Sequence, residues 1–221
     1  MHDTAGEFGR RFFEFYWKDD FASVIDLGAL NINGSLRNAC PKDATYVGVD
    51  LIPGLGVDVV VEDPYRLPFD DESFDVGVST SCFEHNPMFW LTFLEIIRVI
   101  KPKGYLYLNC PSNGYYHAYP VDCWRFYPDA GLALEMWAKH SLKQVTLLES
   151  FVALRQTDQW NDNVMIFQKS SNCVPPSKFL VDEIPTAENI HKCGVAGLIR
   201  ANPATEDQRI ILAATADSIG P

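Results

Sequence analysis

Three aspartates stand at equivalent places in the first third of the sequence. Asp26, Asp50 and Asp63 each close a short run rich in β-branched residues, and turn-forming residues follow each run. Such runs are typical of strands that are buried on both faces of a parallel sheet. Because ligands of these sheets bind at the carboxyl ends of the strands, we expect the three carboxylates to share one binding rim. Any one aspartate alone would more simply be a solvated turn or a helix cap.

The residue types on this rim favour a nucleoside ligand. A carboxylate after the second strand can accept hydrogen bonds from both ribose hydroxyls, and one after the third strand can accept from an exocyclic amine. The first turn has Gly28 and Gly34 but no G-x-G-x-x-G pattern, and no P-loop lysine follows it. We therefore expect a nucleoside without a pyrophosphate, for which S-adenosylmethionine is the leading candidate.

Several motifs resemble, in order, those of class I S-adenosylmethionine-dependent methyltransferases of the small methyltransferase-domain type. The resemblance runs from Val24 to Lys103, with one departure in the first turn, where the family has more glycines and this chain has Leu30 and Ile32. The segments that resemble the family are Asp26–Gly28, Asp50, Asp63–Phe69, Asp71–Val78, Phe83–His85 and Glu95–Gly104.

The resemblance implies a fold, a cofactor and a set of contacts. The fold is α/β and Rossmann-like, with a mostly parallel seven-stranded sheet, helices on both faces and an antiparallel edge strand. The cofactor is S-adenosylmethionine, and the reaction is methylation, which we expect at an oxygen of a small molecule or sugar. The alternative is a methyltransferase-like binding or scaffold domain without catalysis, which the departure at Leu30 and Ile32 motivates. The implied cofactor contacts are Asp26, Gly28, Asn33, Gly34, Asp50, Leu51, Asp63, Pro64 and Ser79.

Composition narrows the class of partner. The 221 residues carry a net charge of −11 and no basic block, which argues against nucleic acid as a substrate. There is no signal pattern and no apolar run of membrane-spanning length. We expect a cytoplasmic protein that acts on a small-molecule acceptor without membrane or nucleic acid, with a homodimer as one arrangement. The cysteines lack C-x-x-C spacing and predict free thiols; they are Cys40, Cys82, Cys110, Cys123, Cys173 and Cys193.

The elements that must position these residues alternate as expected for a parallel sheet. Aromatic residues at helical spacing predict a first helix over 5–18, which either packs on the sheet or covers the cofactor. Apolar periodicity and turn residues predict the other elements. The predicted strands are 23–27, 45–50, 58–62, 74–79, 105–110, 142–151 and 163–168, and the later helices are 88–100 and 129–140.

A long loop, 111–128, follows the fifth predicted strand and should form one wall of the acceptor pocket. Methyl transfer to a hydroxyl requires a proton acceptor, and histidine suits this role because its pKa lies near neutrality. His117 in this loop and His85 after the fourth strand are the catalytic candidates, with loop packing as the simpler alternative. No histidine and carboxylate set has metal-ligand spacing, so we expect no metal site. The candidate substrate contacts are Tyr115, Tyr116, Tyr119, Trp124 and Arg125, and the last of these also forms a bracing pair with Asp122.

The composition changes near residue 170, which divides the chain into a methyltransferase domain at 1–170 and a linker and tail of unknown role at 171–221. Within the tail, Cys193–Ile199 and Ser218–Pro221 weakly resemble the start of a class II glutamine amidotransferase. Those enzymes need the cysteine at a free N-terminus, and Cys193 is internal. We therefore expect no amidotransferase activity.

Overall fold

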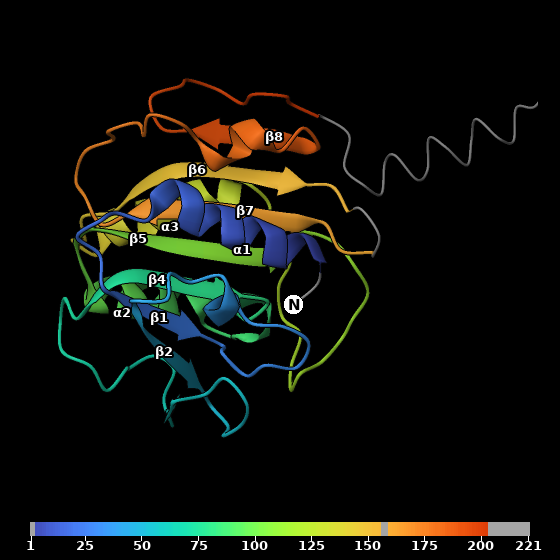
Figure 1. The fold of residues 1–221 in the computed structure, drawn as a ribbon. Coiled ribbons are helices and arrows are strands. Elements are labelled where there is room, and N and C mark those ends of the chain that lie inside the picture. The colour runs from blue at the N-terminus through green and yellow to red at the C-terminus, as the bar shows by residue number, and fades with distance from the viewer. Residues whose placement is uncertain (1–2, 156–158, 203–221) are drawn as a thin grey trace, which may run out of the picture.

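The computed structural model describes residues 3–155 and 159–202, and its framework is one eight-stranded sheet (Figure 1). The strands are β1 (Ser23–Leu27), β2 (Thr45–Asp50), β3 (Val59–Val60), β4 (Phe74–Thr80), β5 (Ile100–Pro111), β6 (Thr146–Ala153), β7 (Asp162–Gln168) and β8 (Ala187–Lys192). They are ordered β3-β2-β1-β4-β5-β7-β6-β8. The strands from β3 to β5 are parallel, whereas β7 and β8 run antiparallel to their neighbours. The mostly parallel sheet is confirmed.

Helices cover both faces of the sheet, as predicted. In Figure 1, α1 (Asp3–Tyr16) lies in front of the sheet, and α2 (Phe89–Val99) and α3 (Asp129–His140) lie behind it. Three short 3-10 turns complete the layers: η1 (Leu36–Asn38), η2 (Phe83–His85) and η3 (Leu180–Glu183). The sheet is therefore the middle layer between two apolar cores. Within the described residues, no helix combines the length and the apolar character needed to cross a membrane.

Helix α1 forms because its aromatic side chains recur at helical spacing on one face. Phe8, Phe12, Phe13 and Tyr16 are each at most 3% exposed. The Phe12 ring packs 5.0 Å from the ring of Tyr107 on β5. The helix is thus held by the burial of its aromatic face on the sheet.

Strand and helix bounds agree with the predicted ones to within a few residues, with four differences. The third strand is reduced to two residues, Val59–Val60, and only the turn η1 lies between β1 and β2. Strand β5 begins at Ile100, directly after α2, and not at residue 105. The sheet has eight strands and not the seven expected, because β8 from the C-terminal segment pairs with the outer edge of β6.

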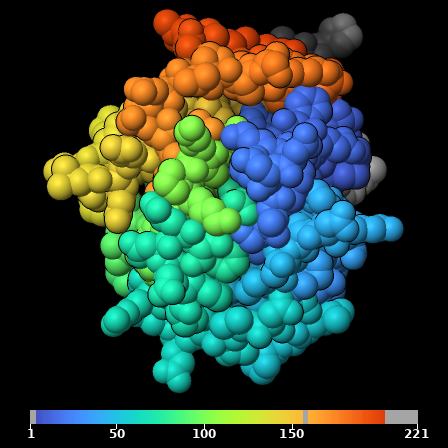
Figure 2. All heavy atoms as spheres, turned by 60° about the vertical axis from the view of Figure 1, so that its left-hand side comes forward, coloured from blue at the N-terminus to red at the C-terminus, as the bar shows by residue number. Residues whose placement is uncertain are grey.

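The segment after residue 170 packs onto the sheet. Leu180, Val181 and Ile184 are at most 3% exposed, and Arg11 of α1 donates a hydrogen bond to the carbonyl of Glu183 at 3.4 Å. Figure 2 shows this C-terminal segment (orange) beside the N-terminal helix (blue) on one face of the molecule. The two ends of the described chain therefore share one surface and one core.

A disulfide joins Cys173 to Cys193, which corrects the prediction that all six cysteines are free thiols. The two residues are 20 positions apart, and only the tertiary structure brings them together. Cys193, the residue that resembles an amidotransferase nucleophile, is thus covalently bonded in this structure. The other part of that resemblance, 218–221, lies outside the described residues.

One buried carboxylate joins the N-terminal helix, the sheet and the C-terminal segment. Glu149 on β6 is fully buried. The hydroxyl of Tyr16 donates to its Oε1. The backbone N–H groups of Leu180 and Val181 donate to its two carboxylate oxygens, each at 2.9 Å. Since a buried carboxylate needs such donors, Glu149 couples the packing of all three segments.

Candidate active site

A cavity of ≈ 890 Å³ opens at the carboxyl ends of β1, β2 and β4. Its walls come from the turn after β1, the ends of β2 and β4, and the loop after β5. This is the edge of the sheet where the sequence predicts a binding rim. Among the residues that line the cavity, none belongs to α1, so the packing interpretation of that helix is the one the structure supports.

Most of the predicted cofactor contacts line this cavity. They are Asp26, Gly28, Asn33, Gly34, Asp50, Leu51 and Pro64. Asp63 and Ser79 are not part of the lining. Asp63 instead accepts a hydrogen bond from the backbone N–H of Tyr65 at 2.8 Å, and the Ser79 hydroxyl donates to the carbonyl of Leu27 at 2.7 Å. Both side chains hold the backbone next to the cavity.

The turn after β1 needs glycine at position 28. Gly28 has a φ of +81°, and a Cβ there would lie 2.5 Å from the Cβ of Cys82. The Gly28 N–H donates to the carbonyl of Val49 at 3.0 Å, so this backbone is tied to β2. At Gly28 the turn therefore lies close to the neighbouring strands and carries no side chain.

Asp50 holds the rest of this turn in place. Its Oδ2 accepts from the N–H of Leu30 at 3.0 Å, and its Oδ1 accepts from the N–H of Leu51 at 2.7 Å. Further along, Asn31 Oδ1 accepts from the N–H of Gly34 at 2.8 Å. Backbone hydrogen bonds to the side chains of Asp50 and Asn31 thus shape a turn that has fewer glycines than the family pattern.

Asp26 is buried beside the cavity, with 6% of its surface exposed. The Tyr46 hydroxyl donates a hydrogen bond to its Oδ2 at 2.7 Å. Burial raises the pKa of Asp26 to about 6, and the hydrogen bond from Tyr46 acts in the opposite direction. Asp26 is thus a carboxylate whose charge is sensitive to pH near neutrality.

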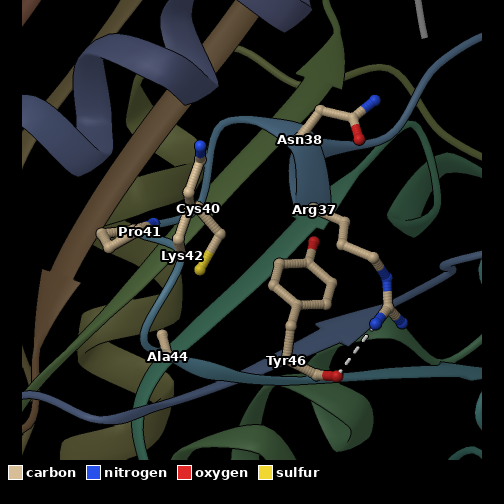
Figure 3. Close-up of a pocket in the computed structure, with 7 residues that line it drawn as sticks. All are labelled: Arg37, Asn38, Cys40, Pro41, Lys42, Ala44 and Tyr46. Carbon is tan, nitrogen blue, oxygen red and sulfur yellow. Dashed lines mark hydrogen bonds between the residues drawn. The ribbon is translucent and has the colours of Figure 1, made fainter.

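The Tyr46 ring is itself held by Arg37. Figure 3 shows the Arg37 guanidinium beside this ring and its hydrogen bond to the Tyr46 carbonyl, which spans 3.1 Å. The guanidinium carbon lies 4.7 Å from the ring centroid. Around these two residues is a separate hollow of ≈ 350 Å³, which shares no lining residue with the larger cavity. Arg37 therefore supports Asp26 from outside the cavity, through Tyr46.

The structure divides the predicted acceptor-side residues. His85, His117 and Tyr119 line the cavity, whereas Tyr115, Tyr116, Trp124 and Arg125 do not. Tyr115 and Tyr116 are 63% and 74% exposed.

Trp124 and Arg125 hold the loop in place. The Trp124 indole N–H donates to the carbonyl of Asn86 at 3.0 Å. Arg125 Nη1 is 2.6 Å from Asp122 Oδ1, which confirms the predicted bracing pair. These two residues support the loop that carries His117.

Three titratable side chains gather where the loop meets η2. Glu84 is 1% exposed, and its Oε1 lies 3.7 Å from Nε2 of His85. The rings of His85 and His117 are 5.0 Å apart between centroids. Burial of His85 lowers its pKa. This face of the cavity can therefore accept or hold a proton from a bound molecule.

Other residues of the cavity wall were not predicted from the sequence. Trp160, whose ring lies 4.6 Å from that of His117, comes from the connection between β6 and β7 and has no local signal. Glu84 stands directly before the predicted His85. Its place in the Phe83–His85 motif was the sequence signal that could have identified it as a cavity residue. The unpredicted lining residues include Leu30, Ile32, Ile52, Tyr65, Cys82, Glu84, Asn86 and Trp160.

Part of this chain is similar in sequence to curated methyltransferases. The phthiotriol/phenolphthiotriol dimycocerosates methyltransferase of Mycobacterium tuberculosis is 36% identical over 124 residues, which cover 46% of this chain and 45% of that protein. The enzyme of the same name from Mycobacterium leprae is 38% identical over 86 residues, or 32% of this chain and 31% of that protein. The chain thus matches less than half the length of these curated relatives.

The fold is shared with solved methyltransferase structures. The 1,6-didemethyltoxoflavin-N1-methyltransferase of Burkholderia thailandensis, solved with 1,6-didemethyltoxoflavin and S-adenosylhomocysteine, has a TM-score of 0.56 at 16% identity. The superposition covers 76% of this chain and 77% of that one. The methyltransferase domain family matches residues 21–108, which hold the turn after β1, Asp50 and η2. Over residues 21–108, this chain is therefore similar to methyltransferase domains.

Proposed function

We propose that this chain transfers a methyl group from S-adenosylmethionine to an oxygen atom of a small molecule. The observation that carries the proposal is that one cavity contains both halves of such a site. Asp26, Gly28 and Asp50 lie on its cofactor side, and His85 and His117 lie on the other. The match of residues 21–108 to the methyltransferase domain family supports the same reaction.

The cofactor side fits this ligand. Gly28 carries no side chain, Cys82 packs where a Cβ would be, and the buried Asp26 stands two residues earlier in the chain. Asp50 accepts one backbone hydrogen bond on each oxygen and keeps further lone pairs for ribose hydroxyls. Asp26 would pair with the ammonium group of the methionine end. When bound, S-adenosylmethionine supplies a methyl group on a positively charged sulfur.

The acceptor side must align an oxygen with the methyl group and take its proton. The oxygen bonds to the methyl carbon as the carbon–sulfur bond breaks, with its electron pair left on sulfur. The hydroxyl proton passes to an imidazole nitrogen. His117 is the first candidate because it lies on the loop and is 31% exposed, against 15% for His85. His85 is the second.

The rim of the cavity favours an apolar acceptor over a sugar. Ile32 and Ile52 line the cavity and are 66% and 49% exposed. Tyr119 and Val121 add a further apolar edge from the loop. Since exposed apolar side chains at a cavity mouth are typical of ligand-binding surfaces, we infer a hydroxyl compound with a substantial hydrocarbon part.

The second candidate function is a binding domain without turnover. The observation that favours it is the turn after β1, where Leu30 and Ile32 replace the glycines of the family pattern. Calorimetric titration with S-adenosylmethionine and S-adenosylhomocysteine is the first test. Binding of neither ligand would contradict the methyltransferase function. Binding without product over a panel of apolar alcohols, phenols and sugars would favour the binding domain.

The histidines are tested once an acceptor is found. We expect His117→Ala to keep its affinity for S-adenosylhomocysteine and to lose turnover by roughly a hundredfold. His140→Ala, which changes an exposed histidine on α3, is the matched control and should keep full activity. If His85→Ala loses turnover and His117→Ala does not, the two roles are exchanged. Full activity in both variants would mean that proton transfer goes to solvent.

A further inference from the structure

Three side chains of metal-ligand type meet at the cavity wall from two distant segments. Glu84 and His85 belong to η2, and His117 belongs to the loop after β5. One ligand atom of each lies within 4.8 Å of those of the other two. Ligands of one ion, bound at about 2.1 Å, stand at most about 4.2 Å apart. The Glu84–His85 pair, at 3.7 Å, is already within that span.

Both histidines are oriented from behind by hydrogen-bond acceptors. His85 Nδ1 lies 2.6 Å from the carbonyl oxygen of Val121. A carbonyl only accepts, so Nδ1 holds the proton and the lone pair of Nε2 faces Glu84. His117 Nδ1 makes a hydrogen bond of 3.3 Å with the carbonyl oxygen of Tyr115 and lies 3.2 Å from Asp122 Oδ2. A carbonyl or carboxylate behind each ring is the usual support of a metal-binding histidine.

The positive charge of Arg125 lies close to this cluster, and the carboxylate of Asp122 balances it. Arg125 Nη2 approaches His117 Nδ1 to 3.3 Å. The same guanidinium makes two hydrogen bonds to Asp122, of 2.6 and 2.8 Å. With Asp122 offsetting Arg125, the carboxylate of Glu84 supplies the net charge that attracts a cation.

We propose that Glu84, His85 and His117 form a binding site for a divalent transition-metal cation, with Zn²⁺ as the best-matched ion. Two imidazoles and one carboxylate are a donor set that zinc and its neighbours accept, whereas Mg²⁺ and Ca²⁺ prefer all-oxygen sites. Rotation of the partly exposed His117 side chain closes the remaining gap. The coordination positions left open face the cavity.

Binding of the cation does not depend on methyl transfer. Only the role of the cation in the reaction rests on the proposed function. A cation here would lower the pKa of an acceptor hydroxyl that contacts it. An imidazole that donates its Nε2 lone pair to a metal no longer accepts a proton. The cation and the histidine base are therefore alternatives for the same step, and metal content decides between them.

Metal binding is measured on the full chain after treatment with a chelator. Co²⁺ serves as the spectroscopic probe, because its visible absorption reports the ligand set, and Zn²⁺ is titrated by calorimetry. We expect one ion per chain and much weaker binding of Mg²⁺. His85→Ala, His117→Ala and Glu84→Gln should each weaken Zn²⁺ binding by more than tenfold. His140→Ala should bind like the parent.

A change behind the site tests whether the support of His117 matters for metal binding. Asp122→Asn keeps the size of the residue that orients His117, and we expect Zn²⁺ affinity to fall about 10- to 100-fold. Thermal unfolding of each variant is recorded alongside.

Three results would overturn the proposal. They are the absence of saturable Zn²⁺ or Co²⁺ binding, unchanged affinity in both histidine variants, and a thiolate-to-cobalt absorption band, which would place the ion on cysteines. Binding of S-adenosylhomocysteine to the metal-free protein is tested separately, so that failure of the metal site and failure of the methyltransferase proposal are distinguishable.

Discussion

The hydroxyl of Tyr46 donates a hydrogen bond of 2.7 Å to Oδ2 of Asp26, and this bond opposes the effect of burial on the carboxylate. Tyr46 stands on β2 and Asp26 on β1, so the hydrogen bond joins two neighbouring strands. Arg37 covers the outer side of the Tyr46 ring. The charge of Asp26 therefore depends first on its burial, and Tyr46 and Arg37, which do not line the large cavity, act against that effect.

Replacing Tyr46 by Phe should shift the pH dependence of cofactor binding. The change removes a donor to the ionised carboxylate, so the pKa of Asp26 should rise above about 6. Only the ionised form attracts the ammonium group of the cofactor, so affinity should fall as the pH drops through this pKa. Calorimetry with S-adenosylhomocysteine from about pH 5 to pH 8 should place the midpoint at a higher pH in Tyr46→Phe than in the parent.

Two further variants make this test specific. Tyr116→Phe changes a tyrosine that is 74% exposed and outside the cavity lining, and it should bind like the parent. Asp26→Asn cannot ionise and should lose the pH dependence altogether. A midpoint that stays in Asp26→Asn would assign it to another group.

Asp50→Ala should weaken binding of S-adenosylhomocysteine by about 2–4 kcal/mol, because charge-assisted hydrogen bonds to both ribose hydroxyls are lost. Asp63→Ala is the matched comparison, since Asp63 also follows a strand but does not line the cavity. We expect Asp63→Ala to lose less affinity for S-adenosylhomocysteine than Asp50→Ala does. Equal losses in the two variants would place Asp63 in the binding site, as the family resemblance implies, and unchanged affinity in Asp50→Ala would remove Asp50 from it.

Leu180→Ala should destabilise the whole methyltransferase fold. The Leu180 side chain is fully buried between the C-terminal segment and the sheet, and removal of such a side chain costs about 2–5 kcal/mol. Leu142→Ala, at a position that is 92% exposed, should stay within about 0.5 kcal/mol of the parent. Chemical denaturation measures both. A loss in Leu180→Ala as small as that in Leu142→Ala would support a domain boundary near residue 170.

The buried Glu149 should make stability decrease with rising pH. Burial raises its pKa from 4.5 to about 7, so the folded chain holds the proton more tightly than the unfolded chain does. Stability is then greatest below about 4.5 and is lost as the pH rises through about 7. Since Glu149→Gln does not titrate, the unfolding free energy of the parent minus that of the variant should fall across this window. A constant difference would show that Glu149 keeps an ordinary pKa.

The cofactor side of the site was largely predictable because its determinants are local. Asp26 and Asp50 stand at the ends of short runs of β-branched residues that turn residues follow, a pattern typical of buried strands. A parallel sheet places the carboxyl ends of such strands on one edge. Gly28 is tied to the same short turn. Where the prediction rested on position alone, as for Asp63 and Ser79, the structure turns the side chain to the backbone, because nearby N–H and carbonyl groups compete for it.

The acceptor side depended on tertiary structure. Sequence analysis singled out His85 and His117, but their meeting with Glu84 requires the loop after β5 to fold back over η2, where Val121 and Asp122 set both rings.

The same holds for the C-terminal segment, whose strand β8 and disulfide have no local pattern. Strand pairing and side-chain clusters between distant segments are set by the packing of the whole chain. For this protein, the sequence alone therefore determined the fold class and the carboxylates at the ends of β1 and β2, and only the folded structure decided which loop residues face the cavity.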